Sequence, residues 1–139
     1  MEPVKLDFVI RGSDFINAGE ASSGTKKALT RLGIAPSAIK RAAIAMYEAE
    51  LNAVIHAGGG RAEVEIYPDH IQIKVIDNGP GIPDVGLAMQ EGWSTAPDIA
   101  REMGFGAGMG LPNIKKNSDD MNIETKIGQG TALSIVIKF

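Results

Sequence analysis

The chain has 139 residues, of which 44% are hydrophobic and 22% charged, and its 14 basic and 17 acidic side chains give a formal net charge of −3. These proportions indicate a single globular domain over residues 1–139 and argue against a disordered or fibrous protein. The absence of cysteine excludes disulfides and thiolate metal sites, and the acidic balance disfavours nucleic acid as a partner. No apolar run approaches the roughly 20 residues of a membrane span, and no apolar signal core opens the chain, so we expect a cytoplasmic protein without membrane contact.

The first part of the chain predicts one strand and two helices. Val4 to Ile10 alternates as a strand does. Ser13 fits the N-cap of a helix that runs to Leu32, where Gly33 closes it. A second, alanine-rich helix runs from Pro36 to about Ala57 and ends before three consecutive glycines.

The second part predicts two hairpins on either side of a glycine-rich stretch. Alternating apolar residues predict strands over Ala62 to Tyr67, Ile71 to Asp77, Met121 to Ile127 and Thr131 to Lys138. Between the hairpins, Asn78 to Gly110 has little periodicity and is typical of a long functional loop. Pro112 suits the first turn of a short helix that ends near Asp119 or Asp120.

This order of elements predicts an α+β fold, a two-layer sandwich with helices on one face of a mixed β-sheet. Strand parity adds a detail, because side chains two residues apart share a face. Asp77 lies on the same face as Ile73 and Val75, and Thr131 lies on the same face as Leu133 and Ile135. A carboxylate and a hydroxyl therefore continue the apolar faces of their strands.

A polar stripe follows the long helix. Glu48, Asn52 and His56 are four residues apart, so each is offset from the last by only about 40° around the helix. Such a stripe can present a carboxylate base and an oxygen ligand for Mg²⁺ to one bound molecule. A solvated helix face with a histidine at its end is the alternative explanation.

A turn with two glycines follows the predicted strand that ends at Asp77. In Asp77-Asn78-Gly79-Pro80-Gly81 the glycines allow the backbone to turn tightly beside a bound ring, and Asp77 can accept a hydrogen bond from an exocyclic amine. The alternative is an ordinary turn at the end of a strand. A carboxylate on an apolar face is partly desolvated and needs a hydrogen-bonding partner, which favours a binding role.

A cluster of glycines precedes the short helix. Gly104, Gly106, Gly108 and Gly110 can bring backbone N–H groups close to phosphate oxygens, next to the positive end of a helix dipole. The dinucleotide-binding G-x-G-x-x-G spacing fails because Met109 and Leu111 stand where glycine is needed, and the P-loop Gly-Lys-Ser/Thr is absent. A flexible hinge remains the alternative.

Taken together, Glu48-x3-Asn52-x3-His56, Asp77-x-Gly79-x-Gly81 and Gly106-x-Gly108-x-Gly110 resemble the N, G1 and G2 boxes of the GHKL ATP-binding fold. The resemblance runs from about Pro36 to Phe139 and is strongest to anti-sigma-factor serine kinases and stressosome switch kinases. It implies that Glu48 is the catalytic base, that Asn52 binds Mg²⁺, and that ATP or ADP lies under a lid formed by Gly86 to Phe105. It also implies that Asp77 recognises adenine. The other implied nucleotide-binding residues are His56, Gly79, Gly81, Gly104, Phe105, Gly106, Ala107, Gly108, Met109, Gly110, Leu111 and Thr131.

The function implied is a Mg-ATP-dependent serine/threonine protein kinase that phosphorylates a STAS-like anti-anti-sigma protein. A sigma factor, a phosphatase and a second copy of the chain are further candidate partners. A sensor histidine kinase would need an upstream phosphoacceptor hairpin and a gyrase-like ATPase a transducer domain, and the sequence contains neither. The main alternative is a nucleotide-gated module that clamps a sigma factor or an enzyme without catalysis. A scaffold that binds no nucleotide would leave Asp77 and the glycine cluster without a role.

Overall fold

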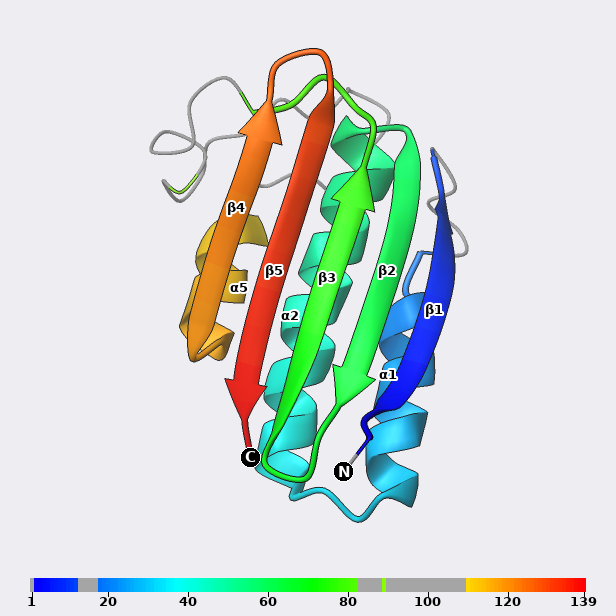
Figure 1. Ribbon diagram of the computed structural model, residues 1–139, viewed down its shortest axis with the longest axis vertical. Coiled ribbons are helices and arrows are strands. Elements are labelled where there is room, and N and C mark those ends of the chain that lie inside the picture. The colour runs from blue at the N-terminus through cyan, green and yellow to red at the C-terminus, as the bar shows by residue number, and fades with distance from the viewer. Residues whose placement is uncertain (1, 13–17, 83–88, 90–109) are drawn as a thin grey trace.

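The computed structural model describes residues 2–12, 18–82, 89 and 110–139 of the chain. In that part the elements are, in order, β1 (Val4–Arg11), α1 (Glu20–Arg31), α2 (Pro36–His56), β2 (Gly59–Ile66), β3 (His70–Asp77), α5 (Gly110–Asn117), β4 (Asp120–Lys126) and β5 (Gly130–Lys138). Figure 1 shows that these helices lie together behind one face of the sheet, with α2 crossing its middle. The predicted two-layer α+β sandwich is confirmed.

The sheet itself is antiparallel, not mixed as the sequence suggested. Its strand order is β1-β2-β3-β5-β4, and all four neighbouring pairs are antiparallel. The helices α1 and α2 both come between β1 and β2 in the chain. The chain therefore runs along the helix layer twice, in opposite directions, and β2 runs opposite to β1 (Figure 1). The two predicted hairpins are β2–β3 and β4–β5, and β5 inserts between β3 and β4.

The core lies between α2 and the central strands. Isoleucine, valine and leucine side chains of β3 and β5 point toward the helix layer and are almost fully buried, as the pairs Ile73–Ile135 and Val75–Leu133 illustrate. The facing side of α2 is rich in alanine, including the fully buried Ala42 and Ala45. Small side chains let α2 lie close to the sheet. This close packing fixes the distance between the polar stripe on α2 and the strands β3 and β5.

The helix α1 begins at Glu20, seven residues after the predicted N-cap, and Ser13 lies outside the described residues. The N-cap residue is Gly19, which makes no side-chain capping hydrogen bond, so the capping side chain comes from the neighbouring helix α2. The Glu50 carboxylate of α2 accepts hydrogen bonds from the backbone N–H of Ala21 (3.2 Å) and of Ser22 (3.3 Å). Glu50 is buried. Its carboxylate accepts from N–H groups that have no partner within α1, and these N–H groups stabilise its buried charge.

The other element boundaries differ from the prediction by a few residues. β2 begins at Gly59 because two of the glycines expected to follow α2 already pair with Ile10 and Arg11 of β1. α5 begins at Gly110, two residues before Pro112, and it ends at Asn117, whose side-chain amide donates to the Asn113 carbonyl (2.8 Å). None of the helices described is both long and apolar enough to cross a membrane.

Candidate nucleotide site

The polar stripe on α2 faces the start of α5. Glu48, Asn52 and His56 are each half-buried on α2, and α5 packs against this helix. A Cβ added at Gly110 would lie 2.9 Å from Asn52 Oδ1. The absence of a side chain at Gly110 therefore leaves the Asn52 amide directly beside the first residue of α5.

The Glu48 carboxylate is held by a residue of α5. Burial raises the pKa of Glu48 above its usual value, and a hydrogen bond from the Asn113 side chain partly opposes this increase. The carboxylate is thus a stronger base than an exposed glutamate, with its orientation fixed by an amide donor. In the sequence, the signal for Asn113 is only its place three residues after the last glycine of the cluster.

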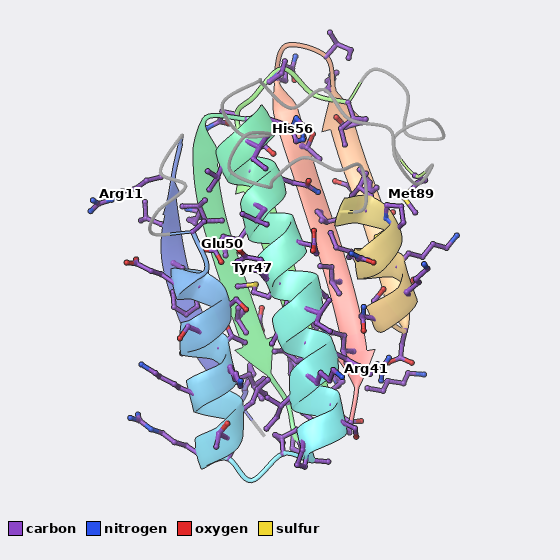
Figure 2. The ribbon with its side chains drawn as sticks, turned by 180° about the vertical axis from the view of Figure 1, so that it is seen from behind. Arg11, Arg41, Tyr47, Glu50, His56 and Met89 are labelled. Carbon is purple, nitrogen blue, oxygen red and sulfur yellow. The ribbon has the colours of Figure 1, made fainter. Side chains whose placement is uncertain are left out.

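His56 lies in the last turn of α2, at the end of the molecule where β3 ends (Figure 2). Burial lowers the pKa of His56 below its usual value, so its imidazole is neutral at pH 7. The turn after β3 packs against the same end of α2, because a Cβ at Gly79 would lie 2.6 Å from Ala57 Cα. The helical stripe and the glycine turn are therefore adjacent.

Asp77 ends β3 opposite Thr131 of β5. Its Oδ1 accepts hydrogen bonds from the backbone N–H of Gly79 (2.9 Å) and of Thr131 (3.2 Å). These donors supply the partners that a half-buried carboxylate requires. Within the described residues no hydrogen bond reaches Oδ2, which leaves one acceptor oxygen for a bound molecule.

A second threonine joins this end of the site. Thr131 Oγ1 lies 2.9 Å from Thr125 Oγ1, which in turn accepts a hydrogen bond from the Ile82 backbone N–H (2.8 Å). Gly81 has a positive φ of 82°, and a Cβ there would lie 2.7 Å from the Lys126 carbonyl oxygen. These contacts tie the glycine turn to the β4–β5 hairpin. Thr125 was missed by the sequence analysis, although its register opposite Thr131 could have indicated it.

The glycine cluster is described only in part. Gly104 to Met109 and the predicted lid, Gly86 to Phe105, lie outside the described residues, apart from Met89 in the lid. Gly110 lies beside Asn52, as stated above, and the side chain of Leu111 belongs to the hydrophobic core. Contact of these residues with nucleotide remains a prediction.

The described residues can supply one oxygen ligand for Mg²⁺. No group of three His, Asp or Glu side chains placed to hold a metal occurs among them, so a cage made by protein alone is absent from that part of the chain. Asn52 offers a hard carbonyl oxygen next to Gly110, where the glycine cluster ends. Mg²⁺ commonly takes one or two protein oxygens and completes its shell with substrate phosphates and water, so the residues fit this ion.

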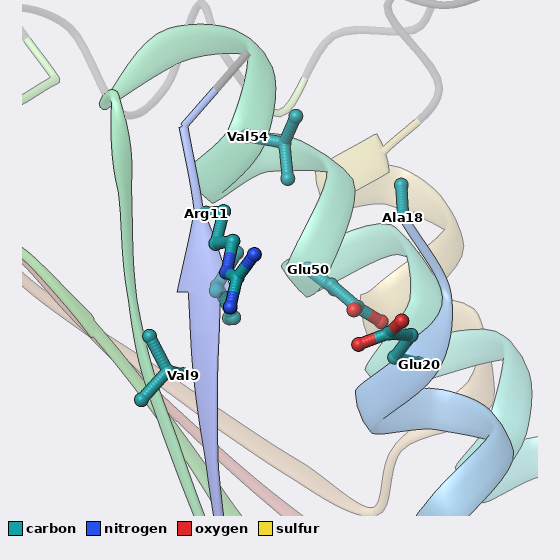
Figure 3. Close-up of a pocket in the computed structure, with 7 residues that line it drawn as sticks. Val9, Arg11, Ala18, Glu20, Glu50 and Val54 are labelled. Atoms are coloured by element: carbon teal, nitrogen blue, oxygen red, sulfur yellow. The ribbon is translucent and has the colours of Figure 1, made fainter. Parts of the chain in front are cut away.

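A separate small cavity lies between β1, α1 and α2. Figure 3 shows Arg11, Glu20 and Glu50 among the residues that line it. Glu50 is engaged in capping α1, and the cavity contains none of the stripe residues, Asp77 or Thr131. The cavity is therefore distinct from the candidate nucleotide site.

Comparison with known proteins gives consistent matches. The family model "Histidine kinase-, DNA gyrase B-, and HSP90-like ATPase" matches residues 38–139. The serine/threonine-protein kinase RsbT of Bacillus subtilis is 31% identical over 100 residues, covering 69% of each chain. An anti-sigma F factor of Clostridium beijerinckii is 33% identical over 101 residues, covering 68% of this chain and 67% of the relative.

Solved structures share the fold at lower sequence identity. A chain in the SiaB–SiaC complex from Pseudomonas aeruginosa superposes with a TM-score of 0.63 at 17% identity, covering 98% of this chain and 90% of that one. The mycobacterial sensor histidine kinase MprB gives a TM-score of 0.55 at 20% identity, with 97% of each chain covered. At these identities the likeness concerns the fold alone.

Proposed function

This chain belongs to the histidine kinase-, DNA gyrase B- and HSP90-like ATPase family, and we propose that it is a Mg-ATP-dependent serine/threonine protein kinase whose substrate is a STAS-like regulatory protein. The relatives support this proposal, since one is a serine/threonine-protein kinase and others are anti-sigma factors. We place its activity in the cytoplasm, where ATP and such regulators occur.

The observation that carries the proposal is the environment of Glu48. Its carboxylate is half-buried, has a raised pKa and receives a hydrogen bond from Asn113. A module that only binds nucleotide has no need of a positioned base next to the metal ligand. A kinase needs one, because the substrate hydroxyl loses its proton as the phosphoryl group is transferred.

The described residues divide the work of phosphoryl transfer. Glu48 orients the serine or threonine hydroxyl and accepts its proton, while the hydroxyl oxygen bonds to the γ-phosphorus and ADP leaves. Asp77 Oδ2 accepts a hydrogen bond from the adenine amine, and Thr131 supports that end of the site. Asn52 would hold Mg²⁺, which would neutralise phosphate charge when bound. Backbone N–H groups at the start of α5 would donate hydrogen bonds to the phosphates.

A nucleotide-gated clamp is the second candidate, because the anti-sigma F factors among the relatives are named for a sigma factor. Such a protein would hold a sigma factor or a phosphatase in its ATP-bound state without transferring phosphate. The Glu48 site distinguishes the two candidates, because a clamp gains nothing from this base.

The test is a phosphorylation assay with purified protein, labelled Mg-ATP and STAS-domain proteins encoded beside its gene. We expect label on a serine or threonine of one of them. Glu48→Gln should keep ATP affinity within a few-fold and cut the transfer rate by roughly 10²-fold or more. Asn52→Ala should instead weaken binding of Mg-nucleotide itself. If the wild type binds Mg-ATP and the partner yet transfers no phosphate, the clamp replaces the kinase.

A further inference from the structure

Two threonine hydroxyls connect the segment after β3 to the end of the site where Asp77 lies. Thr125 on β4 pairs with Thr131 on β5, and their Oγ1 atoms are 2.9 Å apart. The backbone N–H of Ile82, just after the glycine turn, donates to Thr125 Oγ1 at 2.8 Å. Thr131 in turn lies opposite Asp77 of β3. A row of contacts therefore runs from the Ile82 backbone through both hydroxyls to the place beside the Asp77 carboxylate.

The surrounding backbone holds this row at one end of the sheet. The Gly128 N–H of the β4–β5 turn donates to the Pro80 carbonyl at 2.9 Å, so the turn lies against the segment that follows β3 (Figure 1). Gly130 has a positive φ of 116°, and a Cβ there would overlap the Asp77 carbonyl oxygen. Both threonines are half-buried, so their hydroxyls depend on protein partners more than exposed hydroxyls do.

The chemistry of these groups fixes the direction of their hydrogen bonds. A backbone N–H can only donate, so Thr125 Oγ1 accepts from Ile82 and has its own proton left to give. Two acceptors lie near it, the Gly130 carbonyl at 3.3 Å and Thr131 Oγ1 at 2.9 Å. Hydrogen bonds between oxygens are usually about 2.5–3.0 Å long, so Thr125 donates to Thr131.

Thr131 is left with a proton that no described residue receives. Its Oγ1 accepts from Thr125, and within the described residues this hydroxyl has no other hydrogen-bond partner. Oδ2 of Asp77 likewise makes no hydrogen bond to that part of the chain, so it is free to accept. Residues opposite each other in an antiparallel pair have Cβ atoms about 4.5–5.5 Å apart. A donor and an acceptor therefore lie side by side at this end of the sheet.

We propose that Thr125 is a positioning residue for the nucleotide, because it holds the Thr131 hydroxyl with its proton directed at N1 of the adenine ring. This role depends on the proposed nucleotide site, and it applies to a kinase and to a clamp alike. Adenine carries an amine, which donates, next to N1, which accepts. The amine matches Asp77 Oδ2, and N1 matches the Thr131 hydroxyl, directly or through one water. Thr125 does not touch the base and acts through Thr131.

The same row of hydrogen bonds links the base to the Ile82 backbone. When Thr131 donates to N1, its oxygen becomes a better acceptor for Thr125, because hydrogen bonds in a chain polarise one another. Thr125 then becomes a better acceptor for the Ile82 N–H. Bound ATP should therefore strengthen the hydrogen bond between Ile82 and Thr125. A contact that only supports the fold would not depend on a single atom of the adenine ring.

Calorimetry with ATP and with 1-deaza-ATP, in which a C–H replaces N1, tests the contact to the base. We expect the wild type to bind ATP about 3- to 10-fold more tightly than the analogue, as one hydrogen bond contributes. Thr125→Val keeps the shape of threonine without its hydroxyl and should at least halve this ratio, whereas Thr125→Ser should preserve it. Thr30→Val removes an exposed hydroxyl of α1 and is the matched control, which should bind as the wild type does.

A double-variant cycle tests whether Thr125 acts through Thr131. Thr131→Val should bring the ratio of the two affinities close to 1, and adding Thr125→Val should then leave the ratio unchanged. NMR of the wild type should show that the Ile82 amide proton exchanges at least about twofold more slowly with saturating ATP than with saturating 1-deaza-ATP. Thr125→Val should abolish this difference.

The outcomes separate this role from the nucleotide site itself. A wild type that binds ATP and 1-deaza-ATP equally, or a Thr125→Val variant that weakens both nucleotides by the same factor, would refute the role of Thr125 but not the site. A further loss of the ratio when Thr125→Val is added to Thr131→Val would show that Thr125 does not act through Thr131. A wild type that binds neither nucleotide would refute the site and this role together.

Discussion

Replacing Asp77 with asparagine should weaken ATP binding without disturbing the fold. Oδ1 of Asp77 accepts the N–H of Gly79 and of Thr131, at 2.9 and 3.2 Å, and the Oδ1 of asparagine can accept both. Only Oδ2 changes, from an acceptor to an N–H₂ donor that would face the donating amine of adenine. A hydrogen bond to a charged group contributes about 1.5–3 kcal/mol, so we expect ATP to bind about 10- to 150-fold more weakly.

Isothermal titration calorimetry with Mg-ATP and Mg-GTP measures this effect. The preference for ATP over GTP should narrow, because guanine presents a carbonyl where adenine presents its amine, and asparagine can donate to that carbonyl. Asp120→Asn, on the far face of β4, is the control and should bind as the wild type does. The melting temperature without nucleotide should be unchanged in both variants. Equal ATP affinity of Asp77→Asn and wild type would remove Asp77 from the site.

Three further predictions concern other residues of the described structure. Asn113→Ala removes the hydrogen bond that lowers the pKa of Glu48, so this pKa should rise further. Because Glu48 acts as a base only when it is deprotonated, the acidic limb of the pH–rate profile for phosphate transfer should move to higher pH. The exposed Lys115→Ala, on the same helix, should leave the profile in place. Glu50→Ala leaves two buried N–H groups of α1 unpaired and should lower the free energy of unfolding in urea by about 1–3 kcal/mol, whereas Glu50→Gln keeps an acceptor and should cost less. Since burial lowers the pKa of His56 in the folded protein, the unfolded chain binds more protons, and stability should fall as the pH drops below about 6.5. His56→Gln should reduce the loss of stability between pH 7.5 and pH 5.5, and an unchanged loss would show that His56 does not cause it.

Local patterns were sufficient to predict most of the elements and the faces on which two candidate site residues lie. Alternation along two strands placed Asp77 and Thr131 on their apolar faces, and the structure joins them by a hydrogen bond. The four-residue spacing on α2 aligned Glu48, Asn52 and His56, because helix geometry alone fixes that stripe. Both inferences need only the period of a single element.

Features that depend on contact between distant elements were not predictable in the same way. Asn113 meets Glu48 because α5 packs on α2, and no periodicity within either helix encodes that contact. Glu50 lies two residues from Glu48, on another side of α2, and its partners are 28 and 29 residues away. Sheet direction was likewise misjudged, since the order of elements does not say which strands become neighbours.

The place of β5 in the sheet has a consequence for biosynthesis. β5 lies between β3 and β4, although it is the last of these strands to be translated. Until it has left the ribosome, β4 has no neighbour, the Asp77 carboxylate lacks the Thr131 N–H, and the core lacks Leu133, Ile135 and Ile137. A nascent chain that stops before Gly130 should therefore be unable to retain ATP. Competence to bind nucleotide would then appear abruptly with the synthesis of this strand.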